Sequence, residues 1–144
     1  MKRDDIIAVS RTWLGTPYRH RASIRGEGCD CLGLLRGVWR EAIGEEPERL
    51  PPYTPDWVER TAKDTLLLAA QDHLDEIPIG TIKPADVLLF RMAMGSPAKH
   101  CAIVSAPGRI IHAYWGRAVV ETRLVPWWQR RIAAAFAFPG VEHD

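Results

Sequence analysis

One cysteine of this sequence stands where a helix can make a thiol reactive. Cys31 follows Asp30 in the glycine-containing stretch 28–35, and apolar residues recur behind it at helical spacing. The pattern predicts a helix over residues 31–43, with Asp30 as its N-cap. The unpaired N–H groups and the dipole of a helix N-terminus favour a negative charge, so a thiol there ionises readily beside a cationic group. Cys31 is therefore a candidate nucleophile, and the alternative is a small buried core residue.

Two histidines on apolar, strand-like stretches are the candidates for that cationic group. His100 begins the strand expected at residues 100–105, and His112 lies in the strand expected at 109–113, on the same face as Ile110. If the two strands are neighbours, one imidazole can act as a general base while the other holds its orientation and tautomer. The alternatives are a solvated histidine at a strand start for His100 and a hydrogen-bonded core histidine for His112.

Two further residues have types that could serve such a nucleophile. Tyr18 follows a Thr-Pro turn, and its phenol could donate a hydrogen bond to an oxyanion, although an aromatic residue there could equally cover the edge of the core. Gly33 lies one turn into the predicted helix, where glycine costs about 0.5–1 kcal/mol relative to alanine. Its presence predicts the close approach of a substrate chain or of a strand.

A zinc site is the main alternative use of these residues. Thiols and imidazoles are sufficient in number, but Cys29 and Cys31 are separated by one residue, whereas zinc knuckles and ribbons use two to four. His100 and Cys101 are adjacent, so they should point to opposite sides of a strand. We therefore expect no metal and no cofactor. Cys29 is interpreted as a loop residue and Cys101 as a core residue, neither with a chemical role.

Composition indicates an ordinary globular chain. The 144 residues carry a formal net charge of +1, and 47% of them are hydrophobic, which is consistent with one domain over residues 1–144. Nothing in the charge pattern indicates a nucleic acid, and no apolar run indicates membrane insertion. Three cysteines, an odd number, argue against a disulfide scaffold. Acidic residues follow the basic N-terminus where a signal peptide would have an apolar region, so the sequence predicts synthesis in the cytoplasm without a signal peptide.

The order of the expected elements predicts an α+β fold. Helices come first and an antiparallel meander follows, which is typical of one α+β domain. We expect helices at 4–14, 31–43 and 56–73, a surface loop at 20–28 and an extended linker at 45–55. We expect an edge-like piece at 77–82 and strands at 87–90, 100–105, 109–113, 118–122 and 132–138. A basic turn or helix at 125–131 carries Trp127 and Trp128, and we interpret it as a lid over the sheet rather than a partner surface.

Five short motifs together resemble the NlpC-type cell-wall peptidases. They are Gly-Thr-Pro-Tyr at 15–18, Gly-Cys-Asp-Cys-Leu-Gly-Leu at 28–34, Pro-Ala-Asp-Val-Leu-Leu-Phe at 84–90, His-Cys-Ala-Ile-Val at 100–104 and Ile-His-Ala at 111–113. The resemblance covers most of the chain, and the Asp-Cys-x-Gly element is its most specific part. It implies a papain-like (NlpC-type) fold, with N-terminal helices packed on an antiparallel sheet and the nucleophile at a helix N-terminus.

The resemblance also implies a reaction and a set of roles. Cys31 matches the family nucleophile, His100 the general base, and His112 the third polar residue, while Tyr18 and Asp30 are assigned to the oxyanion and substrate region. The family cleaves peptide stems of bacterial peptidoglycan, typically between D-γ-glutamyl and a diamino acid. The sequence looks most like the stand-alone forms of phage tails and gene transfer agents. This implies tail-particle proteins as partners and action in the periplasm or cell wall from a virion-like particle.

Departures from the family pattern keep rival functions open. Leu32 stands where the family often has serine, and the Arg-His-Arg stretch at 19–21 replaces its usual glycines. Both changes border the expected cleft, so they bear on the bond that is cleaved. The rivals are an amidase or acyltransferase on the same fold, a catalytically idle tail-tip adaptor, and a zinc-stabilised binding module.

Overall fold

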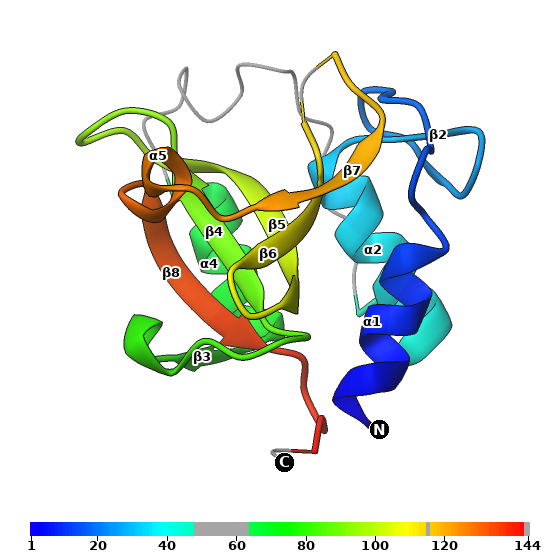
Figure 1. Cartoon of the computed structure of the whole chain (residues 1–144). Helices are drawn as coiled ribbons and strands as arrows, with labels where there is room; N and C mark the ends of the chain where they lie inside the picture. The colour runs from blue at the N-terminus through cyan, green and yellow to red at the C-terminus, as the bar shows by residue number, and fades with distance from the viewer. Residues whose placement is uncertain (48–63, 115, 143–144) are drawn as a thin grey trace.

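The computed structural model describes residues 1–47, 64–114 and 116–142 as an α+β fold (Figure 1). The elements of its first half are α1 (Arg3–Arg11), β1 (Ser23–Ile24), β2 (Gly28–Cys29), α2 (Cys31–Ala42), α4 (Thr65–His73), β3 (Asp75–Ile77) and the 3-10 helix η1 (Ile79–Thr81). Those of its second half are β4 (Val87–Arg91), β5 (Ala98–Ala106), β6 (Arg109–Ala113), β7 (Val119–Arg123), α5 (Pro126–Gln129) and β8 (Ile132–Ala137).

One antiparallel sheet forms the centre of the molecule. Its strand order is β3-β8-β4-β5-β6-β7, so the C-terminal strand β8 inserts between β3 and β4. The neighbours β5 and β6 are joined by a tight turn that contains Gly108, whose φ of +73° favours glycine. This adjacency satisfies the condition under which the two histidines were expected to meet.

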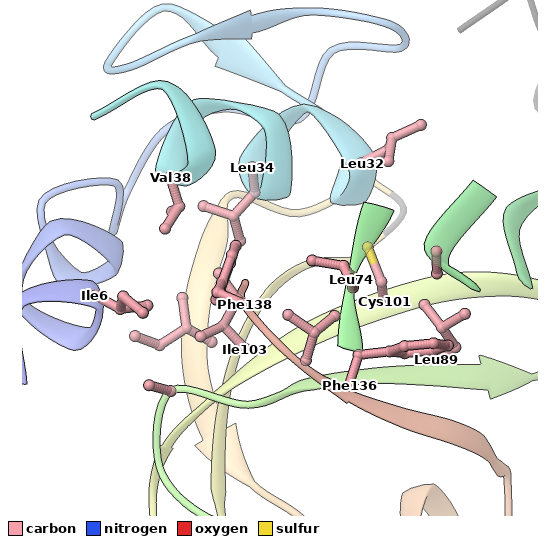
Figure 2. Close-up of a cluster of buried hydrophobic side chains, with 14 of the residues drawn as sticks. Ile6, Leu32, Leu34, Val38, Leu74, Leu89, Cys101, Ile103, Phe136 and Phe138 are labelled. Atoms are coloured by element: carbon pink, nitrogen blue, oxygen red, sulfur yellow. The ribbon is translucent and has the colours of Figure 1, made fainter. Parts of the chain in front are cut away.

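The helices α1, α2 and α4 cover one face of this sheet and form the larger core. Apolar residues recur along α2 at helical spacing, and Figure 2 shows Leu34 and Val38 directed toward Ile103 and Phe138. Gly37 allows the buried Trp13 to pack directly on α2, because a Cβ at this position would overlap the indole ring. Packing of α1 and α2 against the sheet therefore fixes the place of the α2 N-terminus.

The opposite face of the sheet has a smaller core that contains both histidines. Alternate residues of β5 and β6 point to this side, and Leu88, Phe90, Val104 and Ile110 form the buried apolar cluster there. Trp128 of α5 packs against this cluster. The expectation that the 125–131 segment covers the sheet is thereby confirmed for Trp128.

Several element boundaries differ from the expectations. Helix α1 ends at Arg11 rather than at residue 14, because Thr12, Trp13 and Leu14 form tighter turns that lead into Gly15 with its φ of +86°. The expected loop at 20–28 contains the β1–β2 hairpin, and the expected edge piece at 77–82 is the end of β3 followed by η1. The linker beyond residue 47 and the first part of the helix expected at 56–73 lie outside the described residues.

Strand β5 is longer than expected, and this affects the site. It begins at Ala98, so His100 is its third residue rather than its first.

The described part of the chain contains no helix long and apolar enough to cross a membrane.

Candidate active site

Asp30 holds the start of α2 through two backbone hydrogen bonds. Its Oδ1 accepts the Gly33 N–H at 2.7 Å, and its Oδ2 accepts the Arg21 N–H at 2.7 Å. The predicted N-cap is confirmed. The carboxylate is buried and accepts hydrogen bonds from both of these groups. Asp30 therefore orders the loop and the helix start around Cys31.

Tyr18 is brought beside the helix start by a short backbone pairing. The Cys29 N–H donates to the Pro17 carbonyl, and the Arg19 N–H donates to the Cys29 carbonyl, both at 3.0 Å. Burial raises the pKa of Tyr18, and negative charge on the nearby Cys31 and Asp30 raises it further. The phenol is therefore protonated at physiological pH and can donate a hydrogen bond near the Cys31 thiol.

A β-bulge at Lys99 shapes the strand that faces Cys31. Phe90 pairs with His100, whereas Arg91 pairs with Ala98, so Lys99 is the extra residue on β5. The Lys99 carbonyl oxygen lies 3.9 Å from the Cys31 Sγ. The bulge thus places the backbone of β5, next to His100, against the nucleophile candidate.

His100 and His112 are connected by a direct hydrogen bond. His100 Nε2 lies 2.8 Å from His112 Nδ1, and His112 Nε2 lies 3.1 Å from Thr122 Oγ1. When His100 is protonated, its Nε2–H must donate to a neutral His112, which then carries its proton on Nε2 and donates to Thr122. Burial lowers the pKa of His112 to about 3, and the charge on His100 acts in the same direction. His112 can therefore hold the His100 ring without competing for its proton.

Cys31 is surrounded by groups that stabilise its thiolate. A hydrogen bond from Cys101 makes the largest contribution to a lowered pKa of Cys31, burial opposes it, and a hydrogen bond and the charge of His100 lower the pKa further. The pKa of Cys101 is raised well above its usual range, mainly by the same hydrogen bond. The two thiols therefore carry one negative charge. It belongs on Cys31, because only Cys31 also has the helix N-terminus.

Aromatic rings enclose the two imidazoles on the side of the sheet opposite to α1, α2 and α4. The Trp128 ring stacks on His100 with centroids 5.1 Å apart and an interplanar angle of 30°, and it meets His112 edge-on at 5.2 Å. Tyr114 meets the His100 ring edge-on at 5.7 Å. These contacts restrict the imidazole rings and exclude water from one side of them.

The structure brings together all five residues singled out in the sequence: Cys31, His100, His112, Tyr18 and Asp30. Three others were missed, namely Cys101, Trp128 and Thr122. Thr122 pairs with Ile110 and so shares a face with His112, but this register could not be known before β6 and β7 were paired. Cys101 was interpreted as core alone, although its Sγ lies 3.2 Å from the Cys31 carbonyl oxygen.

Cys29, unlike Cys101, has no chemical role in the site. Cys29 is fully buried, and burial raises its pKa to about 12, with the charges of Asp30 and Cys31 acting in the same direction. A thiol with such a pKa stays protonated and unreactive at neutral pH. Among the residues that the structure describes, no group of three or more histidine, cysteine or acidic side chains is arranged to hold a metal ion.

Replacing Cys101 by alanine is expected to raise the pKa of Cys31, because the variant loses the hydrogen bond that stabilises the thiolate. Such a bond to a charged group contributes about 1.5–3 kcal/mol, and about 1.4 kcal/mol corresponds to one pH unit. The pH midpoint of iodoacetamide alkylation at Cys31, followed by mass spectrometry, should therefore rise by about one unit. Cys101→Ser keeps a donor and should stay closer to the wild type. An unchanged midpoint in Cys101→Ala would contradict this role.

Two curated proteins are similar to this chain, and no protein-family model matches it. The gamma-DL-glutamyl hydrolase of Bacillus subtilis is 27% identical over 108 residues, which cover 75% of this chain and 22% of that protein. The probable endopeptidase NlpC of Escherichia coli is 28% identical over 127 residues, which cover 84% of this chain and 71% of that protein. The chain thus spans less than a quarter of the Bacillus protein and most of the Escherichia protein.

Solved structures show the same fold. The NlpC/p60 domain of the peptidoglycan hydrolase SagA superposes with a TM-score of 0.68 at 22% identity, over 96% of this chain and 100% of that domain. RipD of Mycobacterium tuberculosis, described as a non-catalytic NlpC/p60 domain protein adapted to peptidoglycan binding, superposes with a TM-score of 0.57 at 13% identity, over 95% of this chain and 96% of that one. The predicted α+β, NlpC-type fold is confirmed.

Proposed function

We propose that this chain is a cysteine peptidoglycan hydrolase of the NlpC/p60 type. The observation that carries the proposal is that Cys31, at a helix N-terminus, interacts with His100, which is hydrogen-bonded to His112 and through it to Thr122. A thiol, a base and a residue that orients the base are the parts that acyl transfer requires. The names of the two curated relatives, a gamma-DL-glutamyl hydrolase and a probable endopeptidase, support a γ-glutamyl bond as the one cleaved, and the sequence resemblance adds a diamino acid on its other side.

The geometry supports a two-step mechanism. The Cys31 thiolate attacks the amide carbonyl, and the Cys31 N–H and the Tyr18 hydroxyl stabilise the oxyanion, since the first N–H groups of a helix have no intrahelical partner. His100 then gives its proton to the leaving amine, and water, deprotonated by His100, releases the acyl group. His112 and Thr122 hold the His100 ring through both steps, and His112 remains neutral because its pKa is lowered to about 3.

Purified peptidoglycan should be cleaved by the wild-type protein and not by Cys31→Ala. Mass spectrometry of the soluble fragments should detect products that end at D-glutamate in the wild-type digestion alone. Cys29→Ala is the matched control, because it removes another cysteine from the same region whose raised pKa keeps it unreactive, and it should cleave like the wild type.

The other outcomes of this digestion decide between the rival functions. Products cut next to muramic acid, made only when Cys31 is present, would establish an amidase. Equal products from the wild type and Cys31→Ala would contradict the proposed nucleophile. No products from either protein would favour a binding or adaptor role, of the kind described for RipD.

We also propose that the protein acts on the cell wall from a phage-tail-like particle. The support is the sequence resemblance to stand-alone tail and gene-transfer-agent peptidases. Detection of the protein in purified particles tests this location, and its absence from them would contradict it.

A further inference from the structure

A groove of about 400 Å³ is lined in part by His112, the second histidine of the site. Its floor is formed by His112 and Thr122 on β6 and β7, and its walls include Tyr114 and Trp128, whose rings also contact His100. Pockets for small ligands begin at roughly this size. The groove is therefore continuous with the candidate active site rather than separate from it.

Two arginines give this groove a positive charge. Arg117 lies in the β6–β7 turn and Arg123 at the end of β7, and both are exposed. Within the described residues neither makes an ion pair, whereas Arg109, which pairs with Arg123 in the sheet, lies 3.6 Å from the Glu121 carboxylate. No described lining residue is acidic. Guanidinium groups can bind a carboxylate, and the aromatic side chains beside them can contact the apolar or aliphatic group to which it is attached.

The groove is connected to the residue that would protonate the leaving amine. The acyl carbonyl is held by the α2 N-terminus and Tyr18, and neither contributes a residue to the groove. His100 protonates the leaving amine, and the rings of Tyr114 and Trp128 run from His100 into the groove. A substituent on the amine side of the cleaved bond is thus directed along these walls.

We propose that this groove binds a free carboxylate on the leaving-group residue of the substrate, with Arg117 and Arg123 as specificity-determining residues. The inference rests on the proposed hydrolysis of a γ-glutamyl bond and names one chemical feature of its substrate. A diamino acid with a free carboxylate should be preferred over the same residue carrying a carboxamide, since only the carboxylate accepts charge-assisted hydrogen bonds from the guanidinium groups.

The test compares two synthetic peptides with the same γ-D-glutamyl acyl part. In one the leaving diamino acid has a free carboxylate, and in the other this group is a carboxamide. For the wild type we expect a KM about tenfold lower for the carboxylate peptide. The double variant Arg117→Gln, Arg123→Gln should lose this preference, because its KM for the carboxylate peptide rises to that for the carboxamide peptide. Arg130→Gln, an exposed arginine of the same region outside the groove, is the matched control and should keep the preference.

Failure of the inference can be distinguished from failure of the proposed function. Equal KM values for the two peptides in the wild type, or a preference that survives in the double variant, would overturn the carboxylate site. An equal loss on both peptides would show a structural role for the arginines instead. Binding of both peptides to Cys31→Ala by calorimetry separates the cases without cleavage. Tighter binding of the carboxylate peptide supports the groove even if no hydrolysis occurs, and equal binding overturns it.

Discussion

Replacing His100 by alanine should reduce kcat/KM by about 10³–10⁴, because the variant loses both the general base and the stabilisation of the thiolate. The hydrogen bond and the charge of His100 both lower the pKa of Cys31, so this pKa should rise in the variant. The alkylation rate of Cys31 at pH 6 should fall with it, since only the thiolate reacts with iodoacetamide. Hydrolysis of a γ-D-glutamyl peptide and the alkylation rate measure the two effects separately.

Two further variants show whether this loss is specific. His73→Ala removes a histidine at the end of α4. This histidine is not part of the His100–His112 pair, so the variant should retain wild-type activity. His112→Asn, whose side-chain oxygen can still accept from His100 Nε2, should lose less activity than His100→Ala. If His100→Ala retained more than about a tenth of the wild-type activity, the loss would be smaller than the loss expected for a missing general base. The base would then have to be another group.

Replacing Gly33 by alanine should destabilise the fold by about 3 kcal/mol and lower the melting temperature by roughly 10 °C. A Cβ at this position would overlap the Ala22 carbonyl oxygen, which is backbone and cannot rotate away. The same carbonyl accepts the Asp30 N–H, and the Ser23 hydroxyl donates to the Gly33 carbonyl at 2.6 Å. The substitution therefore separates the β1–β2 hairpin from the first turn of α2.

The same displacement should reduce activity, because the Asp30 cap and the position of Cys31 depend on this contact. A displacement of about 1 Å can cost about a hundredfold in rate. Gly80→Ala is the matched control, since the added methyl group would meet no atom within 4 Å and the substitution should change stability by no more than about 0.5 kcal/mol. Thermal unfolding followed by circular dichroism compares the two variants. Equal melting temperatures would contradict the close approach of Ala22 to α2.

The position of the candidate nucleophile at a helix start could be predicted from the sequence because its signals are local. The Asp30 cap, the helical spacing behind Cys31 and the glycine one turn later all lie within a dozen residues. A close contact at Gly33 could also be predicted from the sequence, but its partner could not. The structure shows that the partner is the backbone at Ala22, rather than a substrate. Alternation along the strand likewise placed His112 on the same face as Ile110, which the smaller core confirms.

The environment of the cysteine depended on contacts between distant segments. The sequence by itself determined the helix start, the α+β class and the residue types of the candidate site. Only the tertiary structure decided that Lys99 forms a bulge, that the Cys101 thiol lies against the backbone of Cys31, and that Thr122 is hydrogen-bonded to His112. A one-residue change of strand register moves every side chain to the other face, and register is set by the packing of the whole sheet. Capping and periodicity act between neighbours in the chain, whereas register and bulges do not.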